Sequence, residues 1–308
     1  MEEEVWALTK RRDALGMRAL MIQAIRRFFM ERHYLEVETP CRVPAVIPES
    51  HIDAVACGYW FLHPSPELCM KRLLAAGYER IFQICKCFRD GERGTYHLPE
   101  FTMLEWYRRG IDYRALMEEC RDLITSVGSS IGYENGVVYR GNSVSLKGLW
   151  ECLSVKEAFD RYAPMSMEES LRDDCFDEIM VCDIEPNLGR KRPTFLCDYP
   201  ISADALARRK KENPAVVERF ELYIAGIEIA NACSELIDAN EQELRFERTQ
   251  AYRYSIGKPV YPVSERFLRA FDTMPESAGI ALGVDRLAMI FTDSETIDDV
   301  VAFTPEFL

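Results

Sequence analysis

The chain has 308 residues, 48% of them hydrophobic, and its 51 Asp and Glu against 38 Lys and Arg give a formal net charge of −13. This composition is typical of a globular protein with a sizeable core and excludes the fibrous and disordered classes. No apolar run approaches the roughly 20 residues that a membrane span requires, so we expect no membrane insertion. The first residues, Met1-Glu2-Glu3-Glu4, are acidic where a secretory signal would be basic, so we expect a cytoplasmic protein.

The negative charge is concentrated in two segments. Residues 165–188 hold eight acidic residues and one basic residue, and residues 293–308 hold five acidic residues and no basic one, so the two segments carry −12 of the −13. Binding to nucleic acid draws on clustered Lys and Arg. The charge balance therefore disfavours a large nucleic-acid interface.

The eleven cysteines predict no disulfide framework, because their number is odd, the chain is long and no spacing is C-x-x-C. Cys85 and Cys87 would face the same side of a strand, which suits a metal ion. However, no cluster of histidines stands near them, and the sequence has four histidines in all. The pattern favours reduced, mostly buried thiols over a zinc site.

The first predicted element is an amphipathic helix over residues 13–32, where apolar residues recur at helical spacing. A short strand follows at residues 34–39 and ends before Pro40. Ser65 and Pro66 provide an N-cap and a first-turn proline for a helix over residues 66–76. This helix leads directly into a strand over residues 80–89.

After an eleven-residue loop, a strand is predicted over residues 101–108, and Asp112 caps a helix that runs to about residue 127. Two capping boxes, which begin at Ser154 and Ser166, indicate an acidic helical insertion over about residues 151–190. Ala225-Gly226 joins strands 220–224 and 227–231, and strand 279–283 runs into a helix near Asp285. Strands joined by hairpins, with helices outside, predict a single α+β domain over residues 1–308, built on an antiparallel sheet.

Three of these segments carry candidate chemistry. In the strand over residues 101–108, alternation places Phe101, Met103, Glu105 and Tyr107 on one face. The preceding loop holds Asp90, Glu92, Arg93 and His97, a charge density that suits a triphosphate but is also ordinary for a surface hairpin. Taken alone, this segment favours the surface hairpin.

In the second segment, the expected hairpin places Tyr223 opposite Glu228 and Glu221 opposite Ala230, so all four would share one face. The two carboxylates there would either be solvated or bridge a hard cation such as Mg²⁺, and the pattern leaves both open. In the third segment, small residues at 279, 281 and 283 leave one strand face bare for a flat ligand, and Arg286 follows at a helix start.

Together these segments resemble the motifs of class II aminoacyl-tRNA synthetases, specifically the lysyl branch. Residues 35–40 resemble motif 1, residues 88–107 motif 2 and residues 279–286 motif 3. Within the branch, residues 65–67, 70–74 and 228–231 point to the paralogues that act on elongation factor P. The resemblance covers nearly the whole chain, from about residue 13 to 303.

The resemblance implies a core of six antiparallel strands plus one parallel strand, flanked by helices, in a homodimer joined through motif 1. It also implies that ATP and Mg²⁺ activate an amino acid, (R)-β-lysine or lysine, as its adenylate. The acyl group would then pass to a lysine ε-amine of elongation factor P. A lysyl-tRNA synthetase has an N-terminal anticodon-binding barrel, and the first predicted helix here begins too early to leave room for one. We therefore expect no anticodon-binding domain and no tRNA substrate.

The resemblance further implies roles for individual residues. Arg89 and Arg286 would be catalytic and hold the α- and γ-phosphates, and Phe101 would stack on adenine. The other ATP contacts would be Asp90, Gly91, Glu92, His97, Leu98, Glu228, Ile229 and Gly283. The amino-acid pocket would be lined by Ser65, Pro66, Glu67, Tyr107, Ala230, Asn231 and Glu235. Glu221 and Glu228 would hold Mg²⁺.

The chain departs from the family pattern at several positions. Gly91 stands where motif 2 usually has Glu, Leu98 where the branch has Asn, and Ala232-Cys233 where it has Gly-Phe. Ala230 replaces the Gly of true synthetases, and on the expected hairpin face its methyl group would crowd an α-amino group and favour a β-amine. Two alternatives stay open: a paralogue that activates lysine for another carrier, and a catalytically silent regulatory subunit.

Overall fold

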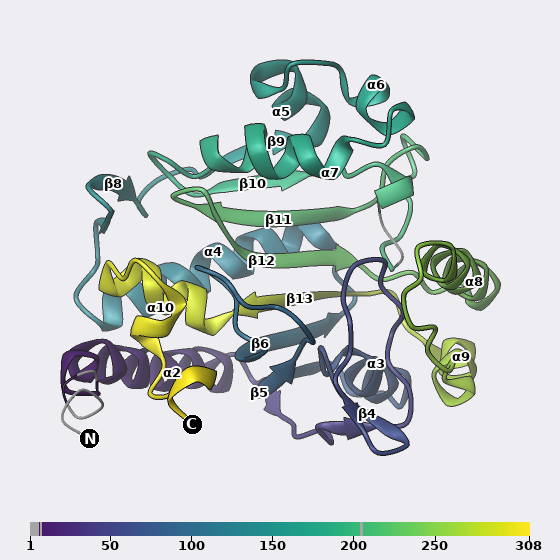
Figure 1. The fold of residues 1–308 in the computed structure, drawn as a ribbon, viewed down its shortest axis with the longest axis horizontal. Helices are drawn as coiled ribbons and strands as arrows, with labels where there is room; N and C mark the ends of the chain where they lie inside the picture. Colours follow the sequence, from purple (N-terminus) through teal and green to yellow (C-terminus); the bar gives the residue numbers. More distant parts are fainter. Residues whose placement is uncertain (1–5, 7, 204–205) are drawn as a thin grey trace.

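The computed structural model describes residues 6, 8–203 and 206–308, so the acidic residues Met1–Glu4 lie outside the described part. Its centre is an eight-stranded sheet with the order β1-β5-β6-β13-β12-β11-β10-β9 (Figure 1). The strands are β1 Leu35–Glu36, β5 Arg80–Phe88, β6 Glu100–Arg109, β9 Glu151–Ser154, β10 Thr194–Cys197, β11 Arg219–Ile224, β12 Ile227–Ser234 and β13 Ser277–Gly283.

The six inner strands, from β5 to β10, are antiparallel, and β1 lies parallel to β5 at one edge. This arrangement confirms the expected six antiparallel strands and one parallel strand. An eighth strand, β9, lies parallel to β10 at the other edge. Residues 151–154, expected to begin a helical insertion, therefore extend the sheet instead, because they pair along β10 from Glu151↔Thr194 to Ser154↔Cys197.

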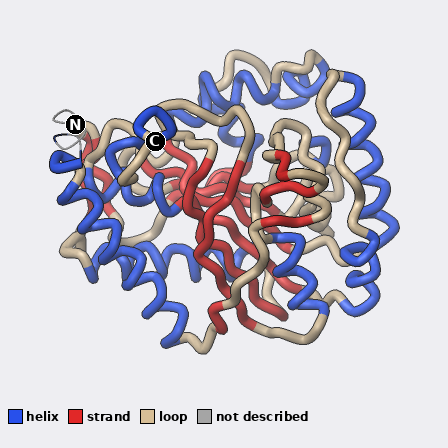
Figure 2. Tube along the Cα trace, turned by 60° about the horizontal axis from the view of Figure 1, so that its bottom comes forward, coloured by secondary structure: helices blue, strands red, loops and turns tan. Residues whose placement is uncertain are grey.

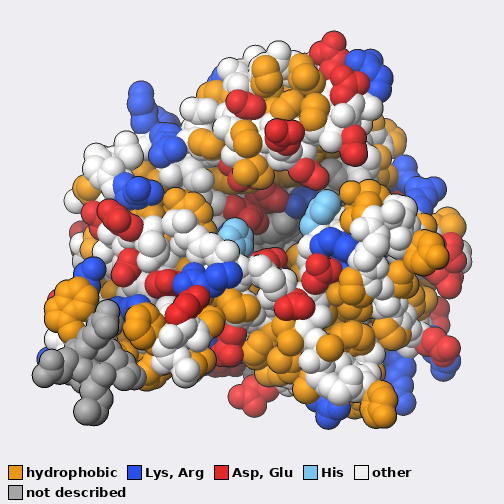
Figure 3. All heavy atoms as spheres, viewed as in Figure 1, with side chains coloured by type: hydrophobic (Ala, Val, Ile, Leu, Met, Phe, Trp, Pro, Cys, Tyr) orange, Lys and Arg blue, Asp and Glu red, His pale blue; other side chains and the backbone are white. Residues whose placement is uncertain are grey.

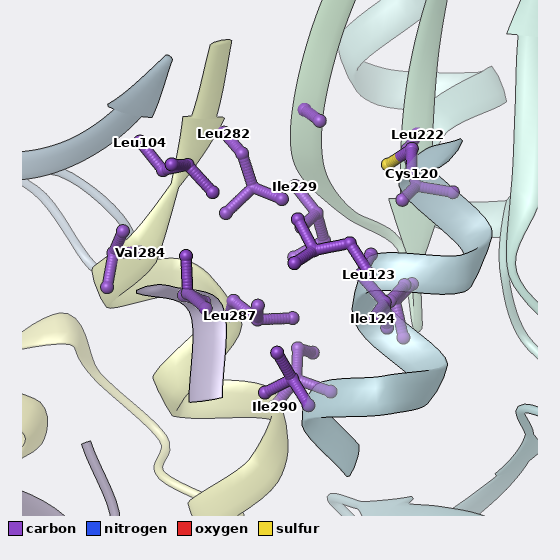
Figure 4. Close-up of a cluster of buried hydrophobic side chains, with 14 of the residues drawn as sticks. Leu104, Cys120, Leu123, Ile124, Leu222, Ile229, Leu282, Val284, Leu287 and Ile290 are labelled. Atoms are coloured by element: carbon purple, nitrogen blue, oxygen red, sulfur yellow. The ribbon is translucent and has the colours of Figure 1, made fainter. Parts of the chain in front are cut away.

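One face of the sheet is covered by three helices: α2 Arg12–Glu31, α4 Tyr113–Ser130 and α10 Val284–Thr292. Their apolar sides form the main core with the strand residues that point toward them, and Figure 4 shows Leu123 and Ile124 of α4 packed close to Ile229 of β12. Asp112 caps α4 as predicted, since its carboxylate accepts hydrogen bonds from the backbone N–H groups of Arg114 and Ala115. The predicted helices 13–32 and 113–127 are thus confirmed with small shifts at their ends.

Most other elements lie around the uncovered face and the sheet edges, whereas the β7–β8 hairpin packs beside α10 on the covered face (Figures 1 and 2). The helices are α3 Glu67–Ala75, α5 Val155–Tyr162, α6 Met167–Arg172, α7 Phe176–Ile179, α8 Ala239–Ser255 and α9 Glu265–Ala270. A small sheet contains β2 Arg42–Val43, β3 Ala56–Cys57 and β4 Trp60–Leu62, and a hairpin contains β7 Gly136–Tyr139 and β8 Asn142–Ser145.

The acidic segment is packed rather than loosely attached. Both predicted capping boxes are present, at Ser154 and Ser166. Phe159 and Phe176 stack at 5.3 Å between ring centroids and belong to a second core that includes Leu196 of β10. In the described part of the chain, no helix is long and apolar enough to cross a membrane.

A buried carboxylate joins α10 to α2 and to β6. Asp285, at the start of α10, is 1% exposed. One of its oxygen atoms pairs with the Arg18 guanidinium of α2 at 2.8 Å, and the other accepts from the backbone N–H of Thr102 in β6 at 2.7 Å. Arg18 also donates to the Thr102 hydroxyl at 2.7 Å. This network fixes the start of α10, which follows Gly283 and carries Arg286, relative to β6.

We expect Asp285→Ala to lower the free energy of unfolding by about 3 kcal/mol, because it leaves the Arg18 guanidinium and the Thr102 N–H without their buried acceptor. Chemical denaturation followed by circular dichroism measures this change. Glu265→Ala removes the exposed Glu265–Arg269 pair on α9 and serves as the control, with almost no effect expected. Equal, small effects of the two substitutions would contradict the assigned role of Asp285.

Candidate active site

The uncovered face of the sheet carries the predicted row of β6 side chains. Glu105 accepts hydrogen bonds from the Tyr107 hydroxyl at 2.6 Å and from the Ser65 hydroxyl at 2.7 Å. Gly279 of β13 pairs with Tyr107, and a Cβ atom at Gly279 would collide with the tyrosine ring. The predicted bare face of β13 therefore exists, and the Tyr107 ring lies across it.

Glu105 is fully enclosed, and its ionisation is disfavoured. Burial raises the pKa of its carboxyl group well above the ordinary value, and the nearby charge of Glu67 raises it further. The hydrogen bonds from Tyr107 and Ser65 oppose this shift. The pocket thus holds an acidic group that would ionise most readily when a cation enters.

Lys71 was missed as a site residue by the sequence analysis. This lysine of α3 is 2% exposed, and its ammonium group lies 2.5 Å from carboxylate oxygens of both Glu67 and Glu235. Burial opposes the charge of Lys71, but Glu235 and Glu67 more than compensate and raise its pKa. The i, i+4 spacing of Glu67 and Lys71 was a readable signal, whereas the pairing with Glu235 depends on the tertiary fold.

The helix α3 begins close to this pocket. Pro66 precedes its first residue, and the Ser65 hydroxyl accepts a hydrogen bond from the backbone N–H of Glu67 at 3.0 Å. Pro66 takes the N-cap position, one residue later than predicted, so Ser65 lies just before the helix and also donates to Glu105. The four predicted pocket residues Ser65, Pro66, Glu67 and Glu235 lie together with Tyr107.

The hairpin of β11 and β12 corrects the expected register. Tyr223 pairs with Glu228 as predicted, but Leu222 pairs with Ala230 and Glu221 pairs with Asn231. A bulge at Ile229 adds one residue to β12, so every position beyond it moves to the opposite face. Ala230 is consequently buried in the main core against the helices, and the predicted contact of its methyl group with a substrate amine is wrong.

The same bulge brings Asn231 into the network around Glu221. Arg219 donates to Glu221 at 2.6 Å, and the hydroxyl groups of Tyr199 and Tyr223 each donate to its second oxygen at 2.6 Å. The Asn231 amide donates to Glu221 at 3.2 Å. Arg219 was missed, although its position two residues before Glu221 on one strand face was a readable signal.

Arg286 joins β12 to the loop between β5 and β6. Its guanidinium donates to the carboxylate of Glu228 at 2.9 Å and to the backbone carbonyl of Tyr96 at 3.2 Å. It also lies 2.7 Å from Nε2 of His97, which must accept because a guanidinium only donates. Burial and the Arg286 charge both lower the pKa of His97, in agreement with a neutral ring.

Arg89 and Phe101 lie next to each other on the same face. The guanidinium of Arg89 is 5.0 Å from the centroid of the Phe101 ring and 3.7 Å from the Glu92 carboxylate. The backbone N–H of Asp90 donates to the carbonyl of Asp53 at 2.7 Å. Gly91 has a φ of +72°, a conformation that a glutamate would adopt only with strain, which accounts for the departure from the usual motif 2 residue.

Two residues predicted to contact ATP have side chains that point into the core, away from the face that carries Arg89 and Arg286. The side chains of Leu98 and Ile229 are 3% and 2% exposed and belong to the main core beneath the sheet (Figure 4 for Ile229). Any contact from these positions has to come from their backbone groups. Gly283 lies at the start of α10, directly before the helix that carries Arg286.

A cleft of about 310 Å³ separates the acidic segment from this face. It is lined by His51, Phe176, Asp177, Met180, Val181, Glu185, Tyr199, Arg219 and Glu221. His51 and Asp177 approach to 3.6 Å across its rim. Figure 3 shows the hollow in this face of the molecule and the acidic side chains that gather beside it.

Glu185 adds a third carboxylate to the nucleotide side and was missed by the sequence analysis. Burial, followed by the charges of Glu221 and Glu228, raises its pKa to about 7. Three carboxylates that repel one another are a donor set for a hard divalent cation, which takes oxygen ligands. The residues present therefore fit Mg²⁺, with Glu228 partly exposed and Glu221 held by four hydrogen bonds.

Comparison with known proteins agrees with this geometry. The family model described as tRNA synthetases class II (D, K and N) matches residues 6–306. The chain is 40% identical over 302 residues to the elongation factor P--(R)-beta-lysine ligase of Proteus mirabilis (strain HI4320), with 93% of each chain covered. It is 38% identical over 319 aligned positions to the protein of the same name from Salmonella arizonae, with 98% of each covered.

The two relatives have about the same length as this chain, since nearly all of each is covered. The match to the family model spans both edges of the sheet and includes the motif-like segments around Arg89 and Arg286. The chain therefore belongs to the class II tRNA synthetase family of the D, K and N type.

Proposed function

We propose that this protein activates (R)-β-lysine with ATP as an aminoacyl-adenylate and transfers the acyl group to a lysine ε-amine of elongation factor P. The observation that carries the proposal is an enclosed cluster of acidic side chains, Glu67, Glu105 and Glu235, on the face of the sheet that also holds Arg89 and Arg286. The names of the two relatives supply the amino acid and the protein acceptor.

The charge of the pocket suits a substrate with two ammonium groups. Lys71 neutralises one of the two carboxylates that it contacts, and Glu105 adds a second acidic group that can ionise. A diammonium amino acid brings positive charge into this enclosed site, where charge-assisted hydrogen bonds are strong. The substrate carboxylate would then point along the sheet face toward Arg89.

In the first step, the amino-acid carboxylate attacks the α-phosphate of ATP, and pyrophosphate leaves. Both reactants are anionic, so their charge must be neutralised before they can approach. Arg89 would hold the α-phosphate and Arg286 the γ-phosphate, and Phe101 would stack on adenine. The Arg89 guanidinium lies 5.0 Å from the Phe101 ring, so the two proposed contacts, with the α-phosphate and with adenine, would lie side by side.

Glu221 and Glu228 would hold Mg²⁺, which supplies positive charge against the phosphate oxygens, and Glu185 lies close enough to contribute. In the second step, the neutral ε-amine of elongation factor P attacks the adenylate carbonyl. A carbon–nitrogen bond forms, AMP leaves, and the amine loses a proton. No side-chain nucleophile of the enzyme is needed.

The proposal includes a homodimer formed through α2 and β1. Leu20, Met30 and Leu35 are large apolar side chains on these two elements, and each is at least half exposed. β1 is also an edge strand of the sheet. An apolar surface beside an open strand edge is typical of a subunit interface. The proposal also places the reaction in the cytoplasm and excludes tRNA as the acceptor.

Intact-mass measurement of elongation factor P tests the proposal directly. Incubation with the purified protein, ATP and (R)-β-lysine is expected to add one lysyl group, and α-lysine is expected to serve less well. Arg286→Ala should reduce the rate by about 100-fold or more, because it removes charge stabilisation of the phosphates, whereas Arg269→Ala, on the exposed side of α9, should not change it. Charging of tRNA with no modification of elongation factor P would overturn the proposal.

A separate prediction concerns the role of Glu105 in binding the amino acid. Glu105→Gln should raise KM for the amino acid about 10-fold or more in pyrophosphate exchange, because an ionised hydrogen-bond acceptor is lost. KM for ATP should change little. Glu100→Gln, at an exposed position on the same strand, is the matched control. A parallel change in both KM values would count against a pocket role for Glu105.

The raised pKa of Glu185 leads to a prediction of how the free energy of unfolding depends on pH. Its pKa is raised to about 7 in the folded protein, so the folded state binds a proton that the unfolded state has already lost above about pH 4.5. This contribution to the free energy of unfolding is present at low pH and is lost as pH rises to about 7, by up to about 3 kcal/mol.

Urea unfolding of ligand-free protein between pH 5 and 8 measures the effect. The difference in free energy of unfolding between the native protein and Glu185→Gln should vary across this range. Relative to the variant, the native protein should be more stable at pH 5 than at pH 8. The same series with Glu178→Gln, in the same acidic segment, should give a constant difference. A constant difference for Glu185→Gln as well would show that Glu185 is not crowded by Glu221 and Glu228.

A further inference from the structure

Two cysteines and a histidine lie close together on the active face, next to Phe101. A ring nitrogen of His63 and the sulfur atoms of Cys85 and Cys87 all lie within 4.8 Å of one another. His63 follows β4 and precedes the pocket residue Ser65, whereas both cysteines belong to β5. We propose that His63, Cys85 and Cys87 form a binding site for a thiophilic divalent cation, with Zn²⁺ as the physiological candidate.

The spacing of the two sulfur atoms fits this ion. Cys85 and Cys87 are two residues apart on one strand face, and their Sγ atoms are 3.9 Å apart. Two thiolates on a tetrahedral Zn²⁺, each at about 2.3 Å, are separated by about 3.8 Å. The ligand-free protein therefore already holds both sulfur atoms at the distance that zinc requires.

The histidine is oriented as a metal ligand would be. His63 is 1% exposed, and its Nε2 lies 2.8 Å from the backbone carbonyl of Lys86. Since a carbonyl only accepts, Nε2 carries the proton, and Nδ1 is left with a lone pair. This Nδ1 atom is buried, and its one polar neighbour in the described part of the chain is the Cys85 thiol, which is itself a member of the cluster. A backbone carbonyl that fixes the tautomer of a ligating histidine is the usual outer partner in zinc sites.

The charge and the chemical softness of the donor atoms also suit Zn²⁺. Two thiolates balance a divalent cation, so the occupied site is neutral, and this matters because Cys87 is fully buried. The donors are two sulfur atoms and one imidazole, with no carboxylate among them, which selects against Mg²⁺ and Ca²⁺. The thioether of Met103 lies 3.9 Å from the Cys87 sulfur and adds to the soft surroundings.

The site is accessible from solvent, and it lies between two parts of the active face that are distant in sequence. Cys85 is partly exposed, so the ion can enter from that side, and water can take a fourth coordination position. Binding releases the two thiol protons to solvent. The ion would connect β5, which leads to Arg89, with the segment that carries Ser65, so it would brace two parts of the active face that are distant in sequence.

Metal titration of the reduced, metal-stripped full-length protein tests the proposal. One equivalent of Zn²⁺ per chain should bind and raise the melting temperature, and Co²⁺ in its place should give a thiolate-to-cobalt charge-transfer band. Cys87→Ser should weaken Zn²⁺ binding about 10-fold or more and remove most of that band. Cys182→Ser, at an exposed position outside the cluster, should leave both unchanged.

Cys85→Ser and His63→Gln repeat the measurement at the other two positions, and a melting curve without metal confirms that each variant is folded. Unchanged Zn²⁺ affinity in folded Cys85→Ser and Cys87→Ser, or bound Co²⁺ without the charge-transfer band, would overturn the proposal. Its failure would leave the proposed ligase activity intact, because that activity rests on the acidic pocket and the two arginines.

Discussion

The pairing of buried and partly buried carboxylates with cations is the constraint on which the active face depends. Glu235, Glu221 and Glu228 lie on or directly after two neighbouring strands, and they pair with Lys71, Arg219 and Arg286. An ionised carboxylate removed from water is costly unless a cation and hydrogen bonds compensate it. Lys71 comes from α3 and Arg286 from α10, so charge pairing helps to position both helices against the sheet.

The two faces of the eight-residue strand β12 lie in different environments, one in the apolar core and one on the polar active face. One face holds Ile229, Ala230 and Ala232 in the main core, and the other holds Glu228 and Asn231. Strict alternation cannot place Glu228 and Asn231 on one face, because they are three positions apart. The bulge at Ile229 resolves this conflict, and it is the local irregularity that lets one strand serve both the core and the active face.

Local signals explain what the sequence predicted correctly. Helix caps at Asp112, Ser154 and Ser166 act within one turn, and the alternation of β6 acts within one strand, so both are visible in a short window. The family resemblance added the sheet topology and brought together residues such as Arg89 and Arg286.

The errors and omissions share a different physical origin. The bulge left no mark in the sequence, because Ile229 and Ala230 are both apolar and either one can face the core, and the register of Glu221 was wrong for that reason. Leu98 was placed by its position in a motif, although its side chain contributes to the core. Lys71 with Glu235, and His63 with Cys85, are pairs that only the tertiary fold creates.

The two cation sites proposed on this face differ in how close their ligand atoms lie. Among the described residues, His63, Cys85 and Cys87 are the one group of such side chains whose ligand atoms lie within 4.8 Å of one another. Neutral thiols tolerate this proximity, whereas the carboxylates of Glu185, Glu221 and Glu228 repel one another and stay further apart. The soft site would therefore be held by β5 and the chain after β4, whereas the carboxylates of the hard site would approach one another only around a cation. Because the donor sets differ in softness, an ion at the thiol site does not compete for the carboxylates, so one face can hold both.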